Sequence, residues 1–281
     1  MTHKALRIEI AGICAEILVG SAKQFRCLEL KFENFLSVNK PAVRIVVEES
    51  VQPLPVNKKD FTRYSFLPNR ITIAERDGEY LLLVKNGRAI HILGLINVKK
   101  KLCRLFTNNT DFSEALFVDA VRGCLHIFLQ SLKGILLHAS GAIYKGRGYL
   151  FTGPGGSGKS TAVNQLNGTT VLSDECIGVK KYMNSYYMFG TPFHGNNNQT
   201  AALKGIFFPK KAKKMSFKKV KKTEALQRIL SNMFLGVLEQ NVMKNIIETL
   251  TELVEEVPCY EISFSLSSPI LKGLGGLGDV Y

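Results

Sequence analysis

The feature that most restricts the fold of this 281-residue chain is a glycine-rich segment between two periodic ones. The apolar residues 149–152 precede it, and the helix-compatible residues 161–166 follow it. Glycines in such a loop let backbone N–H groups turn inward around phosphate oxygens, and the helix that follows adds partial positive charge. The segment matches the pattern GxxxxGK[ST] at every specified position, with Gly153, Pro154, Gly155, Gly156, Ser157, Gly158, Lys159 and Ser160.

This strand–loop–helix arrangement predicts a phosphate-binding loop, or P-loop, in an α/β fold. Lys159 is expected to reach the β- and γ-phosphates of a nucleotide, and the Ser160 hydroxyl is expected to bind Mg²⁺. Thr161, the next residue, belongs to the same predicted nucleotide site. ATP and Mg²⁺ are therefore the expected cofactors, and no other group of residues has metal-ligand spacing.

Two adjacent carboxylates follow the loop closely. The apolar residues 169–173 end at Asp174 and Glu175, and Asp174 stands 15 positions after Lys159. A right-handed crossover is expected to lay this strand beside the strand of the loop, with its end at the phosphates. One carboxylate could then hold Mg²⁺, and the other could accept a proton from an attacking hydroxyl.

These residues together resemble the HPr kinase/phosphorylase-like family of P-loop kinases, which is related to phosphoenolpyruvate carboxykinase. In that family a histidine precedes the loop hairpin and an Asp-Asp pair ends the next strand, matched here by His138 and by Asp174 with Glu175. The resemblance covers roughly residues 135–210. It implies phosphoryl transfer from ATP to a serine hydroxyl, with Lys159 on the γ-phosphate and His138 near the transferred group.

The resemblance also distributes roles between the two carboxylates. It implies that Glu175 is the general base and that Asp174 holds the metal, but the longer glutamate leaves the choice of base open. Residues 200–206 read TAALKGI and lack the family's ExRGxGxx signature, so HPr is not the expected substrate. Residues 190–198 resemble a loop in a divergent branch, some members of which phosphorylate a serine of a lasso-peptide precursor. His194 in this loop is the candidate substrate contact.

The expected partner is a peptide or protein that carries a serine, and the resemblance allows a homo-oligomer. Two other functions fit the same residues. One is a kinase for the hydroxyl of a small molecule, which an enclosed acceptor pocket would favour. The other is a regulator that binds a nucleotide without transferring phosphate.

The charge of the chain is uneven. Lys and Arg number 37 against 23 Asp and Glu, and eight lysines without an acid lie between Lys210 and Lys222. Such a segment indicates either a solvated basic loop or an anionic partner. It has little aromatic interleaving and no nucleic-acid reader motif accompanies it, so the sequence predicts no nucleic-acid partner. The six cysteines lack CxxC spacing and no apolar stretch reaches ~18 residues, which predicts a cytoplasmic protein without a membrane partner.

The periodic patterns divide the chain into two predicted parts. Residues 1–110 form a β-rich module of antiparallel strands, and residues 111–281 form the P-loop catalytic domain. Within the latter, the spacing predicts a helix over 113–132 and a hairpin that joins 142–144 to 149–152. The predicted fold class is α/β, a mixed sheet of the HPr-kinase and phosphoenolpyruvate-carboxykinase type preceded by the β-rich module.

Overall fold

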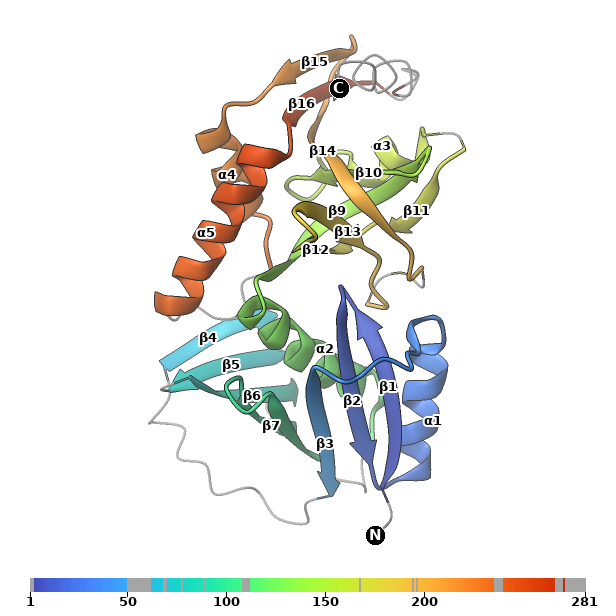
Figure 1. Cartoon of the computed structure of the whole chain (residues 1–281), viewed down its shortest axis with the longest axis vertical. Coiled ribbons are helices and arrows are strands. Elements are labelled where there is room, and N and C mark those ends of the chain that lie inside the picture. The colour runs from blue at the N-terminus through green and yellow to red at the C-terminus, as the bar shows by residue number, and fades with distance from the viewer. Residues whose placement is uncertain are drawn as a thin grey trace. The chain divides into compact units, whose positions relative to one another are not determined.

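The structure is a computed structural model. It describes residues 3–49, 62–67, 70–76, 78–87, 89–107, 112–166, 168–193, 195, 197–234, 240–265 and 270. In this part of the chain the protein is of the mixed α/β class, with two mixed β-sheets and five α-helices (Figure 1). The chain divides into two compact units, Met1–Leu132 with Leu235–Asn245 and Lys133–Phe234 with Ile246–Tyr281.

The first unit is built on an eight-stranded sheet. Its elements are β1 (Lys4–Ile10), β2 (Ile13–Val19), α1 (Ala22–Lys31), the 3₁₀ turn η1 (Glu33–Phe35), β3 (Val43–Glu49), β4 (Thr62–Leu67), β5 (Ile71–Arg76), β6 (Glu79–Asn86), β7 (Ala89–Asn97), β8 (Leu102–Thr107) and α2 (Glu114–Ser131). The strand order is β1-β2-β3-β8-β7-β6-β5-β4. Two of the pairings, β2 with β3 and β3 with β8, are parallel.

The prediction of an antiparallel module is therefore wrong for the middle of this sheet. A parallel pair needs a crossover connection, because the chain must return to the starting end before the second strand begins. Between β2 and β3, α1 supplies that crossover. The alternation of apolar residues reports that a strand has a buried face, and it does not report the direction of the neighbouring strand.

The helix predicted over 113–132 is confirmed as α2. Ser113 is its N-cap, and its side-chain oxygen accepts the N–H of Leu116 at 3.5 Å. The helix packs on β5, β6 and β7, where a side chain at Gly123 would come within 2.9 Å of Leu82. Because of this packing, α2 belongs to the first unit, whereas the sequence placed residues 111–132 in the catalytic domain.

The second unit contains the other sheet, which also has eight strands. Its elements are β9 (Gly134–Tyr144), β10 (Arg147–Thr152), α3 (Lys159–Asn164), β11 (Thr170–Ser173), β12 (Cys176–Tyr182), β13 (Ser185–Phe189), β14 (Thr200–Lys211), β15 (Ser216–Lys219), α4 (Lys222–Leu230), the part of α5 (Gln240–Glu256) from residue 246 on, and β16 (Cys259–Phe264). The predicted hairpin is confirmed as β9 and β10. Part of the lysine-rich segment, for which the sequence leaves a solvated loop and a site for an anionic partner open, forms β15.

Five strands of this sheet close into a ring. β9 pairs with β10, β10 with β14, β14 with β13, β13 with β12, and β12 again with β9. A side chain at Gly141 or at Gly148 would come within 2.7 Å or 2.6 Å of Met188, which is fully buried. Because Gly141 of β9 and Gly148 of β10 lack side chains, the Met188 side chain can occupy the space beside them.

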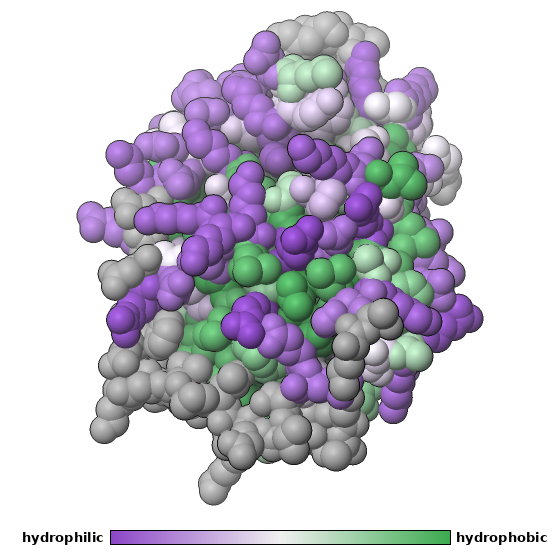
Figure 2. All heavy atoms as spheres, turned by 60° about the horizontal axis from the view of Figure 1, so that its bottom comes forward, coloured by the Kyte–Doolittle hydropathy of each residue, from purple (hydrophilic) through white to green (hydrophobic). Residues whose placement is uncertain are grey.

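Burial elsewhere agrees with the sequence. All six cysteines are buried free thiols, as the absence of paired spacing predicts. None of the helices in the described part of the chain has the length and hydrophobicity to cross a lipid bilayer. Figure 2 shows, on the face that it presents, hydrophobic side chains gathered in one area with hydrophilic ones around them.

The packing inside the ring of strands predicts the effect of shortening Met188. Replacing Met188 by alanine leaves a cavity, and we expect it to lower the free energy of unfolding by about 2–4 kcal/mol. Met183→Ala is the matched control, because Met183 is 78% exposed and its replacement should change the free energy by less than about 0.5 kcal/mol. Urea unfolding followed by circular dichroism measures both. Equal effects of the two substitutions would contradict this account of the core.

Candidate functional site

The predicted P-loop, residues 153–160, connects β10 to α3 in the second unit. β10 lies between β9, which is antiparallel to it, and β14, which is parallel to it. Gly156 and Gly158 have φ angles of 75° and 102°, which L side chains rarely adopt. A side chain at Gly158 would also come within 3.0 Å of the Phe264 ring. Gly156 and Gly158 are therefore required by the backbone of the loop.

Lys159 is the first residue of α3 and is buried. Its Nζ donates to the carbonyl oxygens of Gly153 at 2.8 Å and Pro154 at 3.1 Å, so the side chain folds back across the loop. Burial lowers the pKa of the Lys159 ammonium, and the negative charge of Glu175 opposes that shift. Asp174 and Glu175 form the carboxylate turn. The charge of Glu175 in this turn thus affects the pKa of the P-loop lysine.

The Ser157 hydroxyl is a polar group of the loop without a hydrogen-bond partner in the described part of the chain. Its Oγ is buried and makes no hydrogen bond within the described residues. A buried hydroxyl without a partner costs free energy, and a phosphate oxygen is an acceptor that could satisfy it. The residues of the loop therefore fit a nucleotide phosphate, with a buried ammonium, an unsatisfied hydroxyl and glycines where the backbone turns.

The crossover argument from the sequence predicts that the carboxylate strand lies beside β10. This prediction is wrong. β11 pairs with β9, so β9 lies between β11 and the strand of the P-loop. The reason is that both edges of β10 are already used, one by β9 through the hairpin and the other by β14. β11 and β10 still run in the same direction, because each is antiparallel to β9.

β9 connects the two halves of the site through hydrogen bonds. On one side, Thr152 at the end of β10 donates its hydroxyl to the His138 carbonyl oxygen at 3.2 Å. On the other side, Ser140 donates its hydroxyl to the Asp174 carbonyl oxygen at 2.9 Å, and the Ala139 N–H bonds to the Glu175 carbonyl oxygen at 3.2 Å. Three consecutive residues of β9 therefore hold the start of the P-loop and the carboxylate turn on opposite edges of one strand.

The carboxylate turn is shaped by Ser173. Its buried Oγ accepts the backbone N–H groups of Glu175 at 3.3 Å and Cys176 at 3.1 Å. A register shift between Val171 and Ser173 interrupts the pairing with β9 just before the turn. Asp174 and Glu175 are both exposed. The backbone of the turn is thus held in place while both carboxylates remain accessible.

His138 lies on the face of β9 that carries α3. Side chains alternate along a strand, so His138 shares its face with Ala142, which packs in one apolar cluster with Ala162 and Val163 of α3. The half-buried His138 ring lies 6.0 Å from the Phe234 ring, measured between centroids. The structure therefore brings His138 to the side of the sheet on which the P-loop helix lies.

The loop between β13 and β14 packs along β11. The Gly190 N–H bonds to the Gln199 carbonyl oxygen at 3.1 Å, and the Asn197 side chain donates to the Val171 carbonyl oxygen at 3.1 Å. A side chain at Gly195 would come within 3.0 Å of the Leu172 carbonyl oxygen. Described residues of this loop thus lie close to the carboxylate turn, but the candidate His194 falls outside the described residues.

The remaining predicted residues belong to the first turn of α3. Ser160 and Thr161, predicted for Mg²⁺ and nucleotide, are half-buried there. Across the described residues, no group of three or more His, Cys, Asp or Glu side chains is arranged to hold a metal ion. A Mg²⁺ site of the kind that the motif implies would combine hydroxyl and carboxylate oxygens with oxygens of the phosphates.

Sequence reasoning missed four hydroxyl residues that shape the site. Each donates to or accepts from the backbone at the P-loop or the carboxylate turn, and each is buried. Their signal is a hydroxyl residue in or beside an otherwise apolar strand, where it needs a partner once buried. These residues are Ser140, Thr152, Ser173 and Thr191, the last of which donates to the Cys176 carbonyl oxygen at 2.8 Å.

Comparison with models of known protein families finds no match to the chain. A comparison with curated proteins finds no significantly similar sequence either.

The buried ammonium of Lys159 predicts a ligand-dependent change in stability. Tripolyphosphate at about 100 times its Kd should add about 2.7 kcal/mol to the free energy of unfolding and raise the melting temperature by several degrees. Lys159→Met should abolish this stabilisation, whereas Lys145→Met, at an exposed turn of the same unit, should retain it. Thermal unfolding with and without tripolyphosphate measures the effect. Equal stabilisation of both variants would place the anion elsewhere.

Proposed function

We propose that this protein is an ATP-dependent kinase that transfers the γ-phosphoryl group to the serine hydroxyl of a peptide or protein. The observation that carries the proposal is the arrangement around β9. A P-loop lysine and a pair of carboxylates lie on opposite edges of that strand, and the charge of Glu175 acts on the Lys159 ammonium. A P-loop needs such a carboxylate for phosphoryl transfer to a hydroxyl.

The P-loop would hold the nucleotide. Lys159 would exchange its two backbone acceptors, Gly153 and Pro154, for phosphate oxygens, and the Ser157 hydroxyl would gain the partner that it lacks. Ser160 and Asp174 are the residues assigned to Mg²⁺. When bound, Mg²⁺ would neutralise negative charge on the phosphates.

The transfer step needs a base for the acceptor hydroxyl. The acceptor oxygen bonds to the γ-phosphorus as the bond from that phosphorus to the bridging oxygen of ADP breaks, and the hydroxyl proton passes to a carboxylate. Glu175 is the proposed base, because the family resemblance gives that role to the second carboxylate of the pair. His138, on the face that carries α3, would stabilise charge on the transferred group.

The exposure of the carboxylates favours a macromolecular acceptor. Asp174 and Glu175 both reach solvent. A small acceptor needs a pocket that excludes water, whereas a peptide or protein brings its own surface to cover the reacting groups. A precursor peptide of the lasso type is the acceptor that the family resemblance suggests, and a homo-oligomer in the cytoplasm is the state that it allows.

Loss of the P-loop lysine should abolish transfer. Wild-type protein incubated with γ-labelled ATP, Mg²⁺ and soluble extract of the source cell should label a peptide or protein on serine. Lys159→Ala should reduce that labelling at least about 100-fold, because the lysine stabilises charge on the phosphates. A labelled metabolite instead would move the proposal to a small-molecule kinase. Nucleotide binding without any labelled product would support a regulator.

Measurements of ATP·Mg²⁺ binding and of phosphoryl transfer should distinguish the roles of Glu175 and Asp174. Glu175→Gln should retain ATP·Mg²⁺ binding, measured by calorimetry, while transfer falls by about 100-fold or more, as for loss of a general base. Asp174→Asn should weaken the dependence of binding on Mg²⁺. The reverse pattern would exchange the two roles, and normal turnover by both variants would refute the carboxylate assignment.

A further inference from the structure

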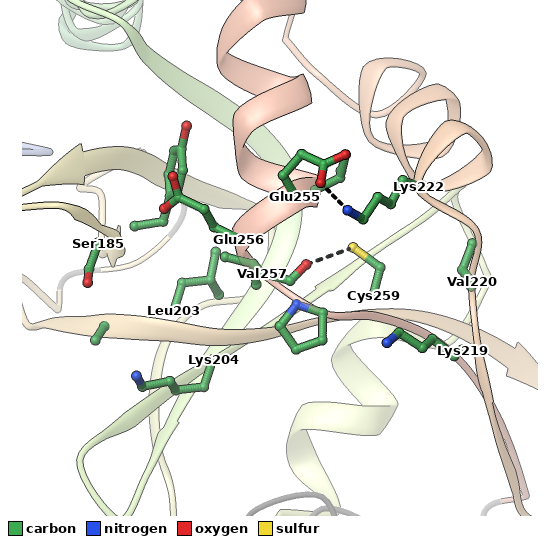
Figure 3. A pocket seen from close by; sticks show the side chains of 14 residues that line it. Ser185, Leu203, Lys204, Lys219, Val220, Lys222, Glu255, Glu256, Val257 and Cys259 are labelled. Carbon is green, nitrogen blue, oxygen red and sulfur yellow. Dashed lines mark hydrogen bonds and ion pairs between the residues drawn. The ribbon is translucent and has the colours of Figure 1, made fainter. Parts of the chain in front are cut away.

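The second sheet has a break at one edge of β14. β13 pairs with β14 as far as Ala202, and β16 pairs with it from Ile206 onward. The three residues between them, Leu203 to Gly205, pair with neither strand, and Lys204 is also skipped in the register with β10. A pocket of about 400 Å³ lies at this break, between the end of α5 and the start of α4 (Figure 3).

Part of the pocket wall is apolar, and the surplus charge of the lining residues is positive. Leu203, Val254, Val257 and Cys259 are buried residues that line it. Burial raises the pKa of the Cys259 thiol to about 12, so this thiol stays neutral and contributes only apolar surface.

The two glutamates at the pocket are already neutralised. Glu255 forms an ion pair with Lys222, toward which it turns in Figure 3, and Glu256 forms one with Lys181. Lys204 and Lys219 also line the pocket, are exposed, and form no ion pair within the described residues. The pocket therefore combines an apolar wall with two uncompensated ammonium groups.

The pocket reaches one end of an edge strand. β15 is the last strand of its sheet and pairs only with β16 among the described residues, so its other edge offers unpaired backbone groups. Lys219, the last residue of β15, lines the pocket. The strand belongs to the segment with eight lysines and no acid.

We propose that the pocket and the outer edge of β15 form a docking site for an acidic, extended segment of polypeptide. The segment adds as a strand to β15, its carboxylates meet the lysines, and an apolar side chain enters the pocket. A polypeptide fits better than a nucleic acid, because a strand edge hydrogen-bonds to another backbone. The aromatic residue of the strand, Phe217, is half-buried and packs against Phe207, which limits the ring surface left for base stacking.

The docking site lies across the sheet from the P-loop strand. Beyond β10 come β14, β16 and β15, with Phe151 level with Phe207, Tyr260 and Lys219, so a strand added to β15 would be the fourth from β10. At about 4.8 Å between neighbouring strands, the separation is on the order of 20 Å. If the docked chain carries the acceptor serine, which rests on the proposed function, that serine must lie about six or more residues from the acidic segment.

Fluorescence anisotropy without nucleotide tests the docking site. The probe is a fluorescein-labelled dodecapeptide in which glutamate alternates with valine, and the reference peptide has glutamine in place of glutamate. We expect the double variant Lys204→Glu/Lys219→Glu to weaken binding of the acidic peptide about tenfold or more. The matched control Lys99→Glu/Lys100→Glu changes the net charge equally at an exposed turn of the first unit and should weaken it less than about twofold.

Several outcomes would overturn the docking site. They are absence of binding, equal weakening by both double variants, and equal binding of the glutamine peptide. A twelve-nucleotide single-stranded DNA is the competing ligand. If it binds more tightly than the acidic peptide, and Lys204→Glu/Lys219→Glu weakens its binding more than the control variant does, the surface is assigned to nucleic acid. Hydrogen exchange gives an independent check, since strand addition should slow exchange of amides in 216–219 on peptide binding.

A transfer assay tests the spacing and keeps the two proposals distinguishable. Peptides with serine two or eight residues from the acidic segment should both bind, but only the longer spacing should be phosphorylated efficiently. Binding without phosphorylation of either peptide would contradict the proposed kinase and leave the docking site supported. Equal phosphorylation of both peptides would contradict the spacing.

Discussion

The candidate site depends on one strand, β9, that is hydrogen-bonded on both edges. Along one edge it holds β10 and thereby the start of the P-loop, and along the other it holds β11, β12 and the carboxylate turn between them. Backbone ladders set the spacing between neighbouring strands at about 4.8 Å. Because β9 separates the two halves of the site by one strand, their separation is determined by the sheet and not by flexible side chains.

Burial of the Lys159 ammonium costs free energy, and a bound anion would reduce that cost. The Lys159 ammonium is buried against two carbonyl oxygens, and its pKa is lowered because burial disfavours the charged form. Glu175 offsets part of that penalty from the far edge of β9. A loop with a buried cation and an unsatisfied Ser157 hydroxyl is preorganised for an anionic ligand, since its groups need little rearrangement to receive one.

The second unit separates two kinds of positive charge. Lys159 is buried at the start of α3, whereas the lysines of β15 are exposed on an edge strand, and the glutamates at the nearby pocket form ion pairs with other lysines. A buried cation selects a ligand by geometry, and exposed cations attract a partner over longer range. The break between β13 and β16 leaves a cavity beside the exposed lysines, and an apolar side chain can fit into this cavity.

The sequence by itself determined the features that depend on neighbours along the chain. The glycine pattern with Lys159, the hairpin before it and the helix over 113–132 all follow from local spacing, and the structure contains each of them. Only the tertiary structure decided which strands are neighbours, because alternation reveals a buried face but not the strand on either edge. That is why the insertion of β9 beside the P-loop strand, the parallel pairs of the first sheet, the place of α2 and the roles of Ser140 and Ser173 could not be predicted.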